Sequence, residues 1–234
     1  MIADGEVQAW FASLDCQTET IERMRALLAP DELERAARFH FDRDRNRYIA
    51  GRGMLRRLLG SYVNTVPELL VFRYGEHGKP DLAEPGSPVR FNLSHSHGLA
   101  LYAFVAGREI GCDVEKLRED VWRDRIADRF FSPAETAALN ALPPDQRTLG
   151  FFHCWTRKEA WIKARSHGMS IPLDSFDVNL ASGDPAPLNG TRPDPAEAAR
   201  WTIHPLEAPS GFAAAIAVEG PACRIVAAEW SETI

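Results

Sequence analysis

The order of apolar and polar positions along the chain predicts a mixture of strands and helices. Alternating positions and short apolar runs predict strands at 7–14, 71–74, 90–93, 99–105, 110–115, 175–180, 201–205, 212–218 and 224–230. Apolar residues spaced three or four positions apart predict helices at 19–28, 30–39, 44–62, 122–131, 133–142 and 146–166. Stretches rich in proline and glycine predict loops at 75–88 and 182–195. Because strands and helices do not alternate strictly, we expect an α+β fold.

Two similar segments within the chain indicate that this order of strands and helices occurs twice. The segments 98–107 and 211–220 each hold an apolar run between two glycines, and each follows a long predicted helix and a strand. We therefore expect two similar α+β halves, residues 1–108 and 109–234, related by a pseudo-two-fold duplication. The strand at 7–14 holds no acid, whereas its counterpart holds Asp113 and Glu115. This difference predicts one chemical site per chain, at the junction of the halves.

The composition is that of a soluble globular protein, since 45% of the 234 residues are apolar and 26% are charged. The longest apolar runs, 99–106 and 212–218, are far shorter than the roughly 20 residues that span a bilayer. Asp4 and Glu6 stand where a signal peptide would be basic and then apolar. The four cysteines form no Cys-x-x-Cys pair, which argues against a zinc site or a disulfide framework. We expect a cytoplasmic protein.

The net charge of −6 argues against a protein that binds nucleic acids or membrane surfaces, because such proteins depend on basic faces. One segment departs from this average. Between positions 35 and 57 there are eight arginines and only two acids, Asp42 and Asp44. Such a segment is either a solvated helix face or part of a site for a compact anionic ligand.

Asp113 and Glu115 stand two positions apart on a predicted strand, so their side chains point to the same face. Two carboxylates on one face repel each other unless a cation lies between them. A hard divalent cation such as Mg²⁺ prefers oxygen ligands of this kind. The alternative is an edge strand whose polar face meets water.

Glu159 and Lys163 are four positions apart on the long helix predicted at 146–166. Such a pair is often a surface salt bridge that contributes about 0.3 to 0.5 kcal/mol. This pair instead borders the apolar stripe of the helix, which Phe152, Trp155 and Ile162 mark, and lysine is scarce in the chain. From the residues alone the pair is either such a surface salt bridge or a functional pair, and these two observations count against the first.

Two further segments place polar groups at the ends of strands. In Phe91-Asn-Leu-Ser-His-Ser96, hydroxyl and imidazole groups lead into a glycine turn, and Gly78-Lys79-Pro80 carries a lysine in a turn. Both are consistent with simple turn chemistry or with contacts to an anionic ligand. The chain contains no dinucleotide fingerprint, no Walker-type phosphate loop and no Gly-x-Ser-x-Gly nucleophile motif.

Taken together, four motifs resemble the 4'-phosphopantetheinyl transferases of the Sfp type. They are Ile110-Gly-Cys-Asp-Val-Glu115, Trp155-Thr-Arg-Lys-Glu-Ala-Trp-Ile-Lys163, Phe91-Asn-Leu-Ser-His-Ser96 and Gly78-Lys79-Pro80, and their order and spacing match over about 38–177. The resemblance implies a pseudo-dimeric fold and transfer of 4'-phosphopantetheine from coenzyme A to a serine of an apo acyl or peptidyl carrier protein. Adenosine 3',5'-bisphosphate would be released.

The resemblance also implies roles for individual residues. Asp113, Glu115 and Glu159 would hold Mg²⁺ against the pyrophosphate of coenzyme A. Glu159 would accept the serine proton, directly or through water on the metal, and Lys163 would neutralise the departing phosphate. In the first half, the residues matching coenzyme A contacts are Arg38, Arg47, Arg52, Lys79, Ser94 and His95.

Two other functions remain open from the residues alone: a Mg²⁺-dependent phosphodiesterase, and a non-catalytic protein that binds coenzyme A or a carrier protein. Turnover of coenzyme A separates them, because the transferase needs a carrier protein, the phosphodiesterase needs only water, and the binding protein turns nothing over. We expect a monomer, since the duplication supplies both sides of the site. The sequence carries no readable signal for which carrier is modified.

Overall fold

The computed structural model describes residues 2–84, 86–122, 125–166, 171–180, 183, 185–192 and 194–232. In the first half it forms β1 (Glu6–Ser13), α1 (Thr18–Arg25), α2 (Pro30–Ala37), α3 (Asp42–Val63), η1 (Pro67–Leu69), β2 (Phe72–Tyr74), β3 (Pro80–Leu82), β4 (Val89–Ser96) and β5 (Leu99–Ala106). The second half forms β6 (Ile110–Lys116), η2 (Glu119–Trp122), α4 (Ile126–Phe130), α5 (Pro133–Ala141), α6 (Pro144–Arg165), η4 (Leu173–Ser175), β7 (Phe176–Asp177), β8 (Ala186–Pro187), β9 (Gly190–Thr191), α7 (Pro195–Ala198), β10 (Trp201–Leu206), β11 (Phe212–Glu219) and β12 (Arg224–Glu229).

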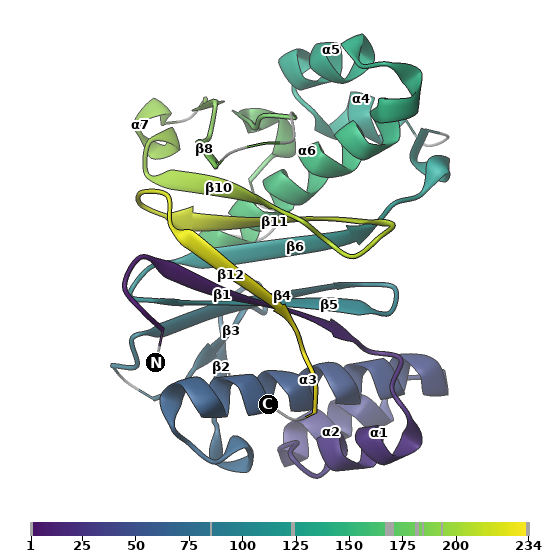
Figure 1. The fold of residues 1–234 in the computed structure, drawn as a ribbon, viewed down its shortest axis with the longest axis vertical. Coiled ribbons are helices and arrows are strands. Elements are labelled where there is room, and N and C mark those ends of the chain that lie inside the picture. The colour runs from purple at the N-terminus through teal and green to yellow at the C-terminus, as the bar shows by residue number, and fades with distance from the viewer. Residues whose placement is uncertain are drawn as a thin grey trace.

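These elements form four layers, with two sheets packed face to face and a long helix outside each sheet (Figure 1). One sheet has the strand order β12-β1-β5-β4 and the other β6-β11-β10-β8. The three strands β1-β5-β4 correspond in order to β6-β11-β10, with α3 and α6 in matching places. The α+β fold and its two similar halves are therefore confirmed.

The central strands β5 and β11 are apolar throughout, apart from Glu219 at the end of β11, because both of their faces are covered. Leu101, Ala103 and Val105 on β5 face the core between the sheets, where they meet residues of β6 and β11. Tyr102 and Phe104 on the opposite face pack against the core that includes α3. This continuous burial explains why the similarity between 98–107 and 211–220 is the clearest internal repeat in the chain.

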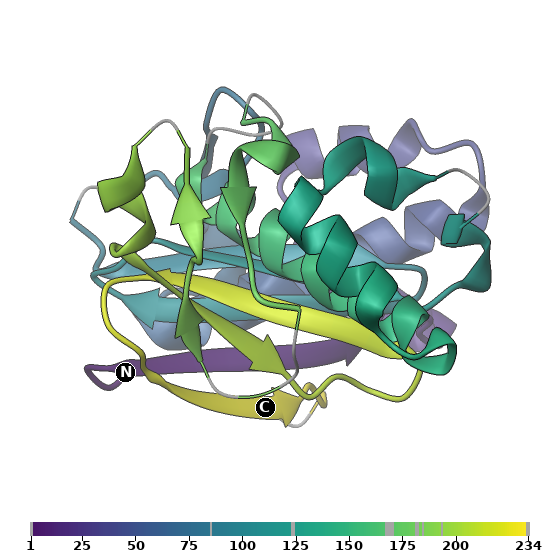
Figure 2. The same cartoon turned by 90° about the horizontal axis from the view of Figure 1, so that it is seen from above.

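The long helix of the second half, α6, lies over the outer face of its sheet (Figure 2). Gly111 on β6 permits a very close approach, because a Cβ atom there would lie 2.1 Å from the carbonyl oxygen of Ala160. The close contact brings the carboxylate-bearing strand β6 against the helix that carries Glu159 and Lys163.

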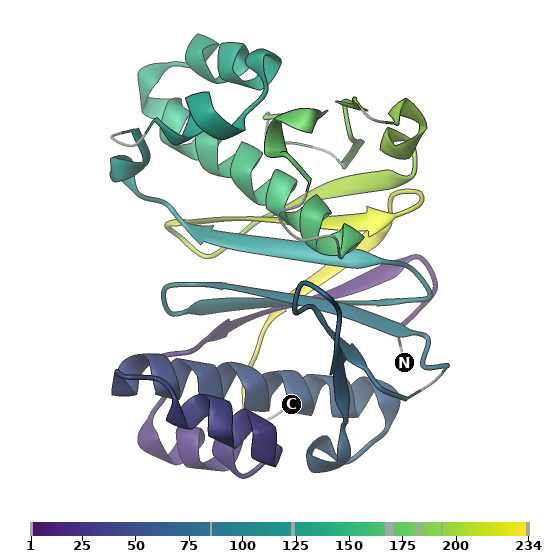
Figure 3. The same cartoon turned by 180° about the vertical axis from the view of Figure 1, so that it is seen from behind.

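The last strand links the halves, since β12 leaves the second half and runs beside β1 in the first sheet (Figure 3). The two strands are parallel, with Glu6 opposite Arg224 and Phe11 opposite Glu229. The first sheet is thus completed by the end of the chain.

Some elements differ from those expected. The helix expected at 122–131 forms only as α4 at Ile126–Phe130, after the 3-10 turn η2; residues 123 and 124 lie outside the described residues. The strand expected at 175–180 is reduced to β7. The loop expected at 75–88 contains β3, which pairs with β2, and the loop expected at 182–195 contains β8 and β9. In the described part of the chain, no helix is both long and apolar enough to cross a membrane.

Candidate active site

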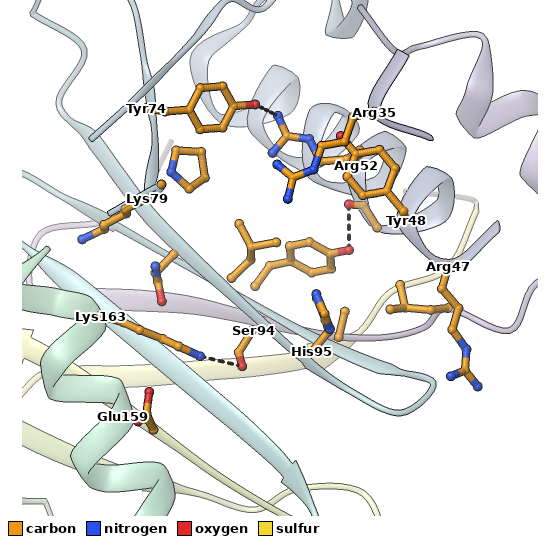
Figure 4. Close-up of a pocket in the computed structure, with 18 of the residues that line it drawn as sticks. Arg35, Arg47, Tyr48, Arg52, Tyr74, Lys79, Ser94, His95, Glu159 and Lys163 are labelled. Atoms are coloured by element: carbon orange, nitrogen blue, oxygen red, sulfur yellow. Dashed lines mark hydrogen bonds between the residues drawn. The ribbon is translucent and has the colours of Figure 1, made fainter. Parts of the chain in front are cut away.

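A cavity of about 960 Å³ lies between the halves. Its walls come from α2, α3, the β2–β3 turn and the end of β4 in the first half, and from α6 in the second (Figure 4). This volume is at the upper end of the range of about 300 to 1,000 Å³ that is typical of small-molecule sites. Of the residues expected in the site, the following line it: Arg47, Arg52, Lys79, Ser94, His95, Glu159 and Lys163.

Asp113 and Glu115 on β6 do not line this cavity, but Asp113 contacts two residues that do, and only 2% of Asp113 is exposed. Its Oδ1 accepts hydrogen bonds from Ser94 Oγ at 2.8 Å and from Lys163 Nζ at 2.6 Å. Its Oδ2 is buried without a hydrogen-bond partner among the described residues. A buried carboxylate oxygen without a partner is costly, so this atom is a candidate ligand for a cation.

Glu115 and Glu159 are the other two carboxylates of the acidic centre. Burial raises the pKa of Glu115, and the charge of Asp113 raises it further; Ser96 Oγ, which donates to Glu115 Oε2 at 2.6 Å, opposes this. Burial also raises the pKa of Glu159, and the charge of Asp113 adds to this. The three acids thus share one region in which negative charge is unfavourable without a cation.

The donor chemistry of this centre fits a hard divalent cation, since it offers carboxylate oxygens and one of them is unpartnered. The three carboxylates do not form a complete coordination site. In the described parts of the chain, no group of three or more His, Cys, Asp or Glu side chains is arranged to hold a metal ion. Asp113, Glu115 and Glu159 are the residues that would hold a cation here, and Asp113 Oδ2 is the oxygen among them that is buried without a partner in the described residues.

Lys163 bridges the acidic centre and the cavity. Its Nζ contacts Ser94 Oγ at 2.9 Å as well as Asp113, and 31% of its side chain is exposed (Figure 4). Burial by itself would lower the pKa of Lys163, but the charge of Asp113 and the hydrogen bond to it outweigh burial and raise it. The lysine is therefore positively charged at neutral pH. Next to it, desolvation and the charge of Lys163 lower the pKa of His95.

The basic side of the cavity comes from α2 and α3. Arg47 forms a two-pronged ion pair with Asp15, at 2.7 and 2.8 Å. Arg52 is held by buried Glu32 on α2, with its Nε 2.8 Å from Glu32 Oε1, and it also donates to the hydroxyl of Tyr74 at 3.0 Å. Both guanidinium groups are therefore fixed by protein partners.

Two residues expected to bind coenzyme A lie differently from the rest. Arg38 does not line the large cavity: its side chain is 79% exposed and lies 4.0 Å from Glu34, beside a shallow hollow on the outer face of α2. Lys79 contributes to the cavity wall, but its ammonium group points away from the cavity toward the second half (Figure 4).

Several residues of the site had no individual role assigned from the sequence: Arg35, Tyr48, Tyr74, His77 and Ser96. Arg35 stacks over the ring of Tyr48 at 5.5 Å. Arg35 belongs to the basic segment, and Ser96 stands two positions after Ser94 on a strand, so charge and strand period could have indicated both. Tyr74 carries no such signal.

Two family models for 4'-phosphopantetheinyl transferases match adjoining parts of the chain. The model described as 4'-phosphopantetheinyl transferase superfamily matches residues 109–217, and the one described as 4'-phosphopantetheinyl transferase, N-terminal, matches residues 13–109. The 4'-phosphopantetheinyl transferase HetI of Nostoc sp. is 39% identical over 221 residues, which cover 94% of this chain and 90% of HetI.

Two further relatives carry the same description. The 4'-phosphopantetheinyl transferase Sfp of Bacillus subtilis is 35% identical over 163 residues, covering 69% of this chain and 70% of Sfp. The 4'-phosphopantetheinyl transferase AcpT of Escherichia coli O157:H7 is 43% identical over 140 residues, covering 59% of this chain and 66% of AcpT. The chain belongs to the 4'-phosphopantetheinyl transferases, enzymes that transfer the 4'-phosphopantetheine group from coenzyme A to a carrier protein.

Proposed function

We propose that the cavity between the halves binds coenzyme A together with Mg²⁺, and that a serine hydroxyl of an apo acyl or peptidyl carrier protein is the acceptor. The observation that carries this proposal is the meeting of an acidic centre and a basic wall in one cavity. Glu159 and Lys163 line the cavity from the second half, with Asp113 hydrogen-bonded to Lys163, and Arg47 and Arg52 line it from the first half. Coenzyme A carries a phosphate ester at its nucleotide end, which suits the basic wall. Its pyrophosphate needs a cation, which suits the acidic centre.

Asp113, Glu115 and Glu159 are the residues that would hold Mg²⁺, with Asp113 Oδ2 as the anchor because it is buried without a partner among the described residues. The ion, when bound, supplies positive charge that offsets the negative charge repelling an incoming oxygen. The protein side chains supply the rest of the chemistry.

The reaction forms a bond between the serine oxygen and the phosphorus that bears pantetheine. The bond from that phosphorus to the bridging pyrophosphate oxygen breaks, and adenosine 3',5'-bisphosphate leaves with the electron pair. Glu159, which lines the cavity, accepts the serine proton directly or through a water molecule. Lys163 stabilises the charge on the departing phosphate, since its ammonium group lies at the cavity beside Ser94.

The first half holds the nucleotide in this proposal. Arg47, Arg52, Ser94 and His95 line the cavity where the phosphates and the adenosine would lie. Arg38 stands outside the cavity, so it is not among the residues that hold the nucleotide in this proposal. We also propose a boundary between the halves at 108/109, in the segment that links β5 to β6. We further propose that the protein acts in the cytoplasm as a monomer.

The test is intact-protein mass spectrometry of an apo acyl carrier and an apo peptidyl carrier, each incubated with the protein, coenzyme A and Mg²⁺. We expect a mass gain of one phosphopantetheine group that disappears with EDTA. Hydrolysis of coenzyme A without a carrier would indicate the phosphodiesterase instead, and coenzyme A binding without turnover would indicate the non-catalytic protein. For substitutions of Asp113, Glu115 or Glu159 in this assay, Asp42→Asn is the matched control. Asp42 is also an acid, but it is 81% exposed and pairs with Arg45 on the surface.

A further inference from the structure

Lys79 lines the expected nucleotide pocket, but its charged group turns away from the pocket toward the second half (Figure 4). Its Nζ donates to the backbone carbonyl of Ile110 at 3.0 Å and to that of Ala164 at 3.3 Å. It also lies 3.5 Å from Glu109 Oε2, and only 16% of its side chain is exposed. All three partners belong to the second half, of which Glu109 is the first residue.

These contacts occupy the lysine fully. An ammonium group has three N–H donors and no acceptor, and here there are three oxygen partners. Burial lowers the pKa of Lys79, as expected for an ammonium group removed from water, and the charge of Glu109 opposes this. A phosphate of the ligand could therefore bind Lys79 only if these contacts broke.

The two carbonyls belong to the two elements that carry the proposed catalytic groups. Ile110 is the first residue of β6, which carries Asp113, and Ala164 follows Lys163 in the last turn of α6. The last carbonyls of a helix lack partners within the helix, and a cation at that end is favourable. Lys79 thus binds both elements near the place where Gly111 lets them touch.

The backbone of Lys79 is equally well fixed, but in the first half. Gly75 N donates to the carbonyl of Lys79 at 3.0 Å, and Gly78 N donates to that of Gly75 at 2.9 Å. Gly78 has a φ of +78°, which favours glycine, and Pro80 pairs with Tyr74 across the β2–β3 ladder. The turn that forms the cavity wall is therefore held by backbone hydrogen bonds within the first half, and the lysine side chain connects it to the second half.

We propose that Lys79 is a positioning residue that ties the nucleotide-binding wall of the first half to β6 and α6, rather than a ligand of a coenzyme A phosphate. The tie sets where Asp113 and Lys163 stand relative to a pyrophosphate held by the first half. The proposal rests on the proposed function in one respect: it takes the cavity to be the coenzyme A site.

The experiment compares Lys79→Met, Lys79→Gln and Lys79→Arg with the wild type in kcat, KM and calorimetric affinity for coenzyme A at several salt concentrations. For the Met and Gln variants we expect kcat to fall about tenfold to hundredfold, because misplacement by about 1 Å has effects of that size. Affinity should change less than about threefold and keep its salt dependence. Lys79→Arg should recover most of kcat, since a guanidinium can donate to both carbonyls.

Amide hydrogen exchange gives a second readout that does not depend on turnover. Exchange in the last turn of α6 should become faster in Lys79→Met and should stay unchanged in Arg73→Met. Arg73 is the matched control because it lies on the same hairpin, is 66% exposed and pairs only with Asp81 among the ion pairs of the described residues.

The outcomes separate the two roles. A large loss of coenzyme A affinity with a weaker salt dependence and an unchanged kcat would make Lys79 a phosphate ligand and overturn the proposal. Unchanged kcat, affinity and exchange would overturn it as well. If the wild-type protein transfers nothing from coenzyme A, the proposed function fails, and hydrogen exchange still tests the tie by itself.

Discussion

Lys163 Nζ lies 2.6 Å from Asp113 Oδ1, so the lysine of α6 is already the counter-ion of the buried carboxylate on β6. A divalent cation at Asp113 would bring a second positive charge into the same few ångströms. The two cations repel each other unless a further anion joins them. The pyrophosphate of coenzyme A is an anion of the right kind in the proposed function.

We predict from this relationship that Mg²⁺ and coenzyme A bind cooperatively. Without coenzyme A, Lys163 competes with the metal for Asp113, whereas bound pyrophosphate draws Lys163 away and adds oxygen ligands. Coupling of this kind is typically about 1 to 3 kcal/mol, or 5- to 150-fold in affinity. Titration with Mn²⁺, followed by electron paramagnetic resonance with and without coenzyme A, measures it directly.

The variant Lys163→Gln checks the cause of this coupling. It should bind Mn²⁺ more tightly than the wild type when coenzyme A is absent, because the competing charge is gone. Equal Mn²⁺ affinity in the two proteins, with and without coenzyme A, would show that Lys163 does not compete with the metal.

A second prediction concerns Asp113 itself. Asp113→Ala should abolish transfer, because it removes the anchor oxygen, while the fold persists, since assembly of the acidic centre is not needed for the cores of the two halves. Asp113→Asn is the closer test, as it keeps the shape and removes the charge. We expect a loss of at least about a hundredfold in kcat, in line with the removal of one strong electrostatic contact. Near-normal turnover of either variant, measured by carrier mass, would refute the metal assignment.

The sequence predicts the central part of the fold well. Strands covered on both faces need apolar residues throughout, so the runs at 99–105 and 212–218 are sufficient to predict β5 and β11. The sequence pattern does not predict which distant strands pair with each other. The strand at 224–230 is predicted as a strand, but local pattern does not say that it joins β1, more than 200 positions away. The short strands β3, β8 and β9 depend on their neighbours in the same way.

The site shows the same division. Strand and helix periods place Asp113 with Glu115 and Glu159 with Lys163, and the structure brings Lys163 to Asp113. The direction of Lys79 depends on carbonyls up to 85 positions away, and backbone carbonyls leave no trace in a sequence. Arginine type and spacing likewise do not reveal which guanidinium groups are already paired with acids.

The pairing of arginines yields a third prediction. Glu32 accepts hydrogen bonds from both Arg52 and Arg56, and both Glu32 and Arg56 are almost fully buried. Burial alone would raise the pKa of Glu32, but the two arginines outweigh it and lower the pKa. Glu32→Gln would leave two buried cations without a counter-ion, a change that typically costs about 3 to 5 kcal/mol.

Urea denaturation of Glu32→Gln and Glu34→Gln measures this cost with a matched control. Glu34 lies on the same helix and its side chain is 74% exposed, so its substitution should change the free energy of unfolding by less than about 0.5 kcal/mol. Similar free energies of unfolding for the two variants would mean that Glu32 contributes no more than a surface acid.

A final prediction concerns His204 on β10, which is 1% exposed and whose Nε2 lies 3.4 Å from Cys223 Sγ. Burial lowers the pKa of His204 to about 4, and the charge of Arg108 contributes. The unfolded chain, with an ordinary histidine pKa near 6.5, therefore binds a proton between pH 6.5 and 4 that the folded chain does not bind. The free energy of unfolding must fall as pH falls through this window, by about 3 kcal/mol at most, and this contribution is constant below pH 4.

Substitution isolates the contribution of His204 from that of the acids. In His204→Gln, the fall in the free energy of unfolding between pH 7 and pH 4.5 should be smaller than in the wild type, because the side chain no longer takes up a proton. The exposed residue His40 gives the matched control, and His40→Gln should keep the wild-type slope. Urea denaturation at half-unit pH steps measures all three proteins. If His204→Gln and the wild type lose stability in parallel, His204 is not the group whose protonation the fold opposes.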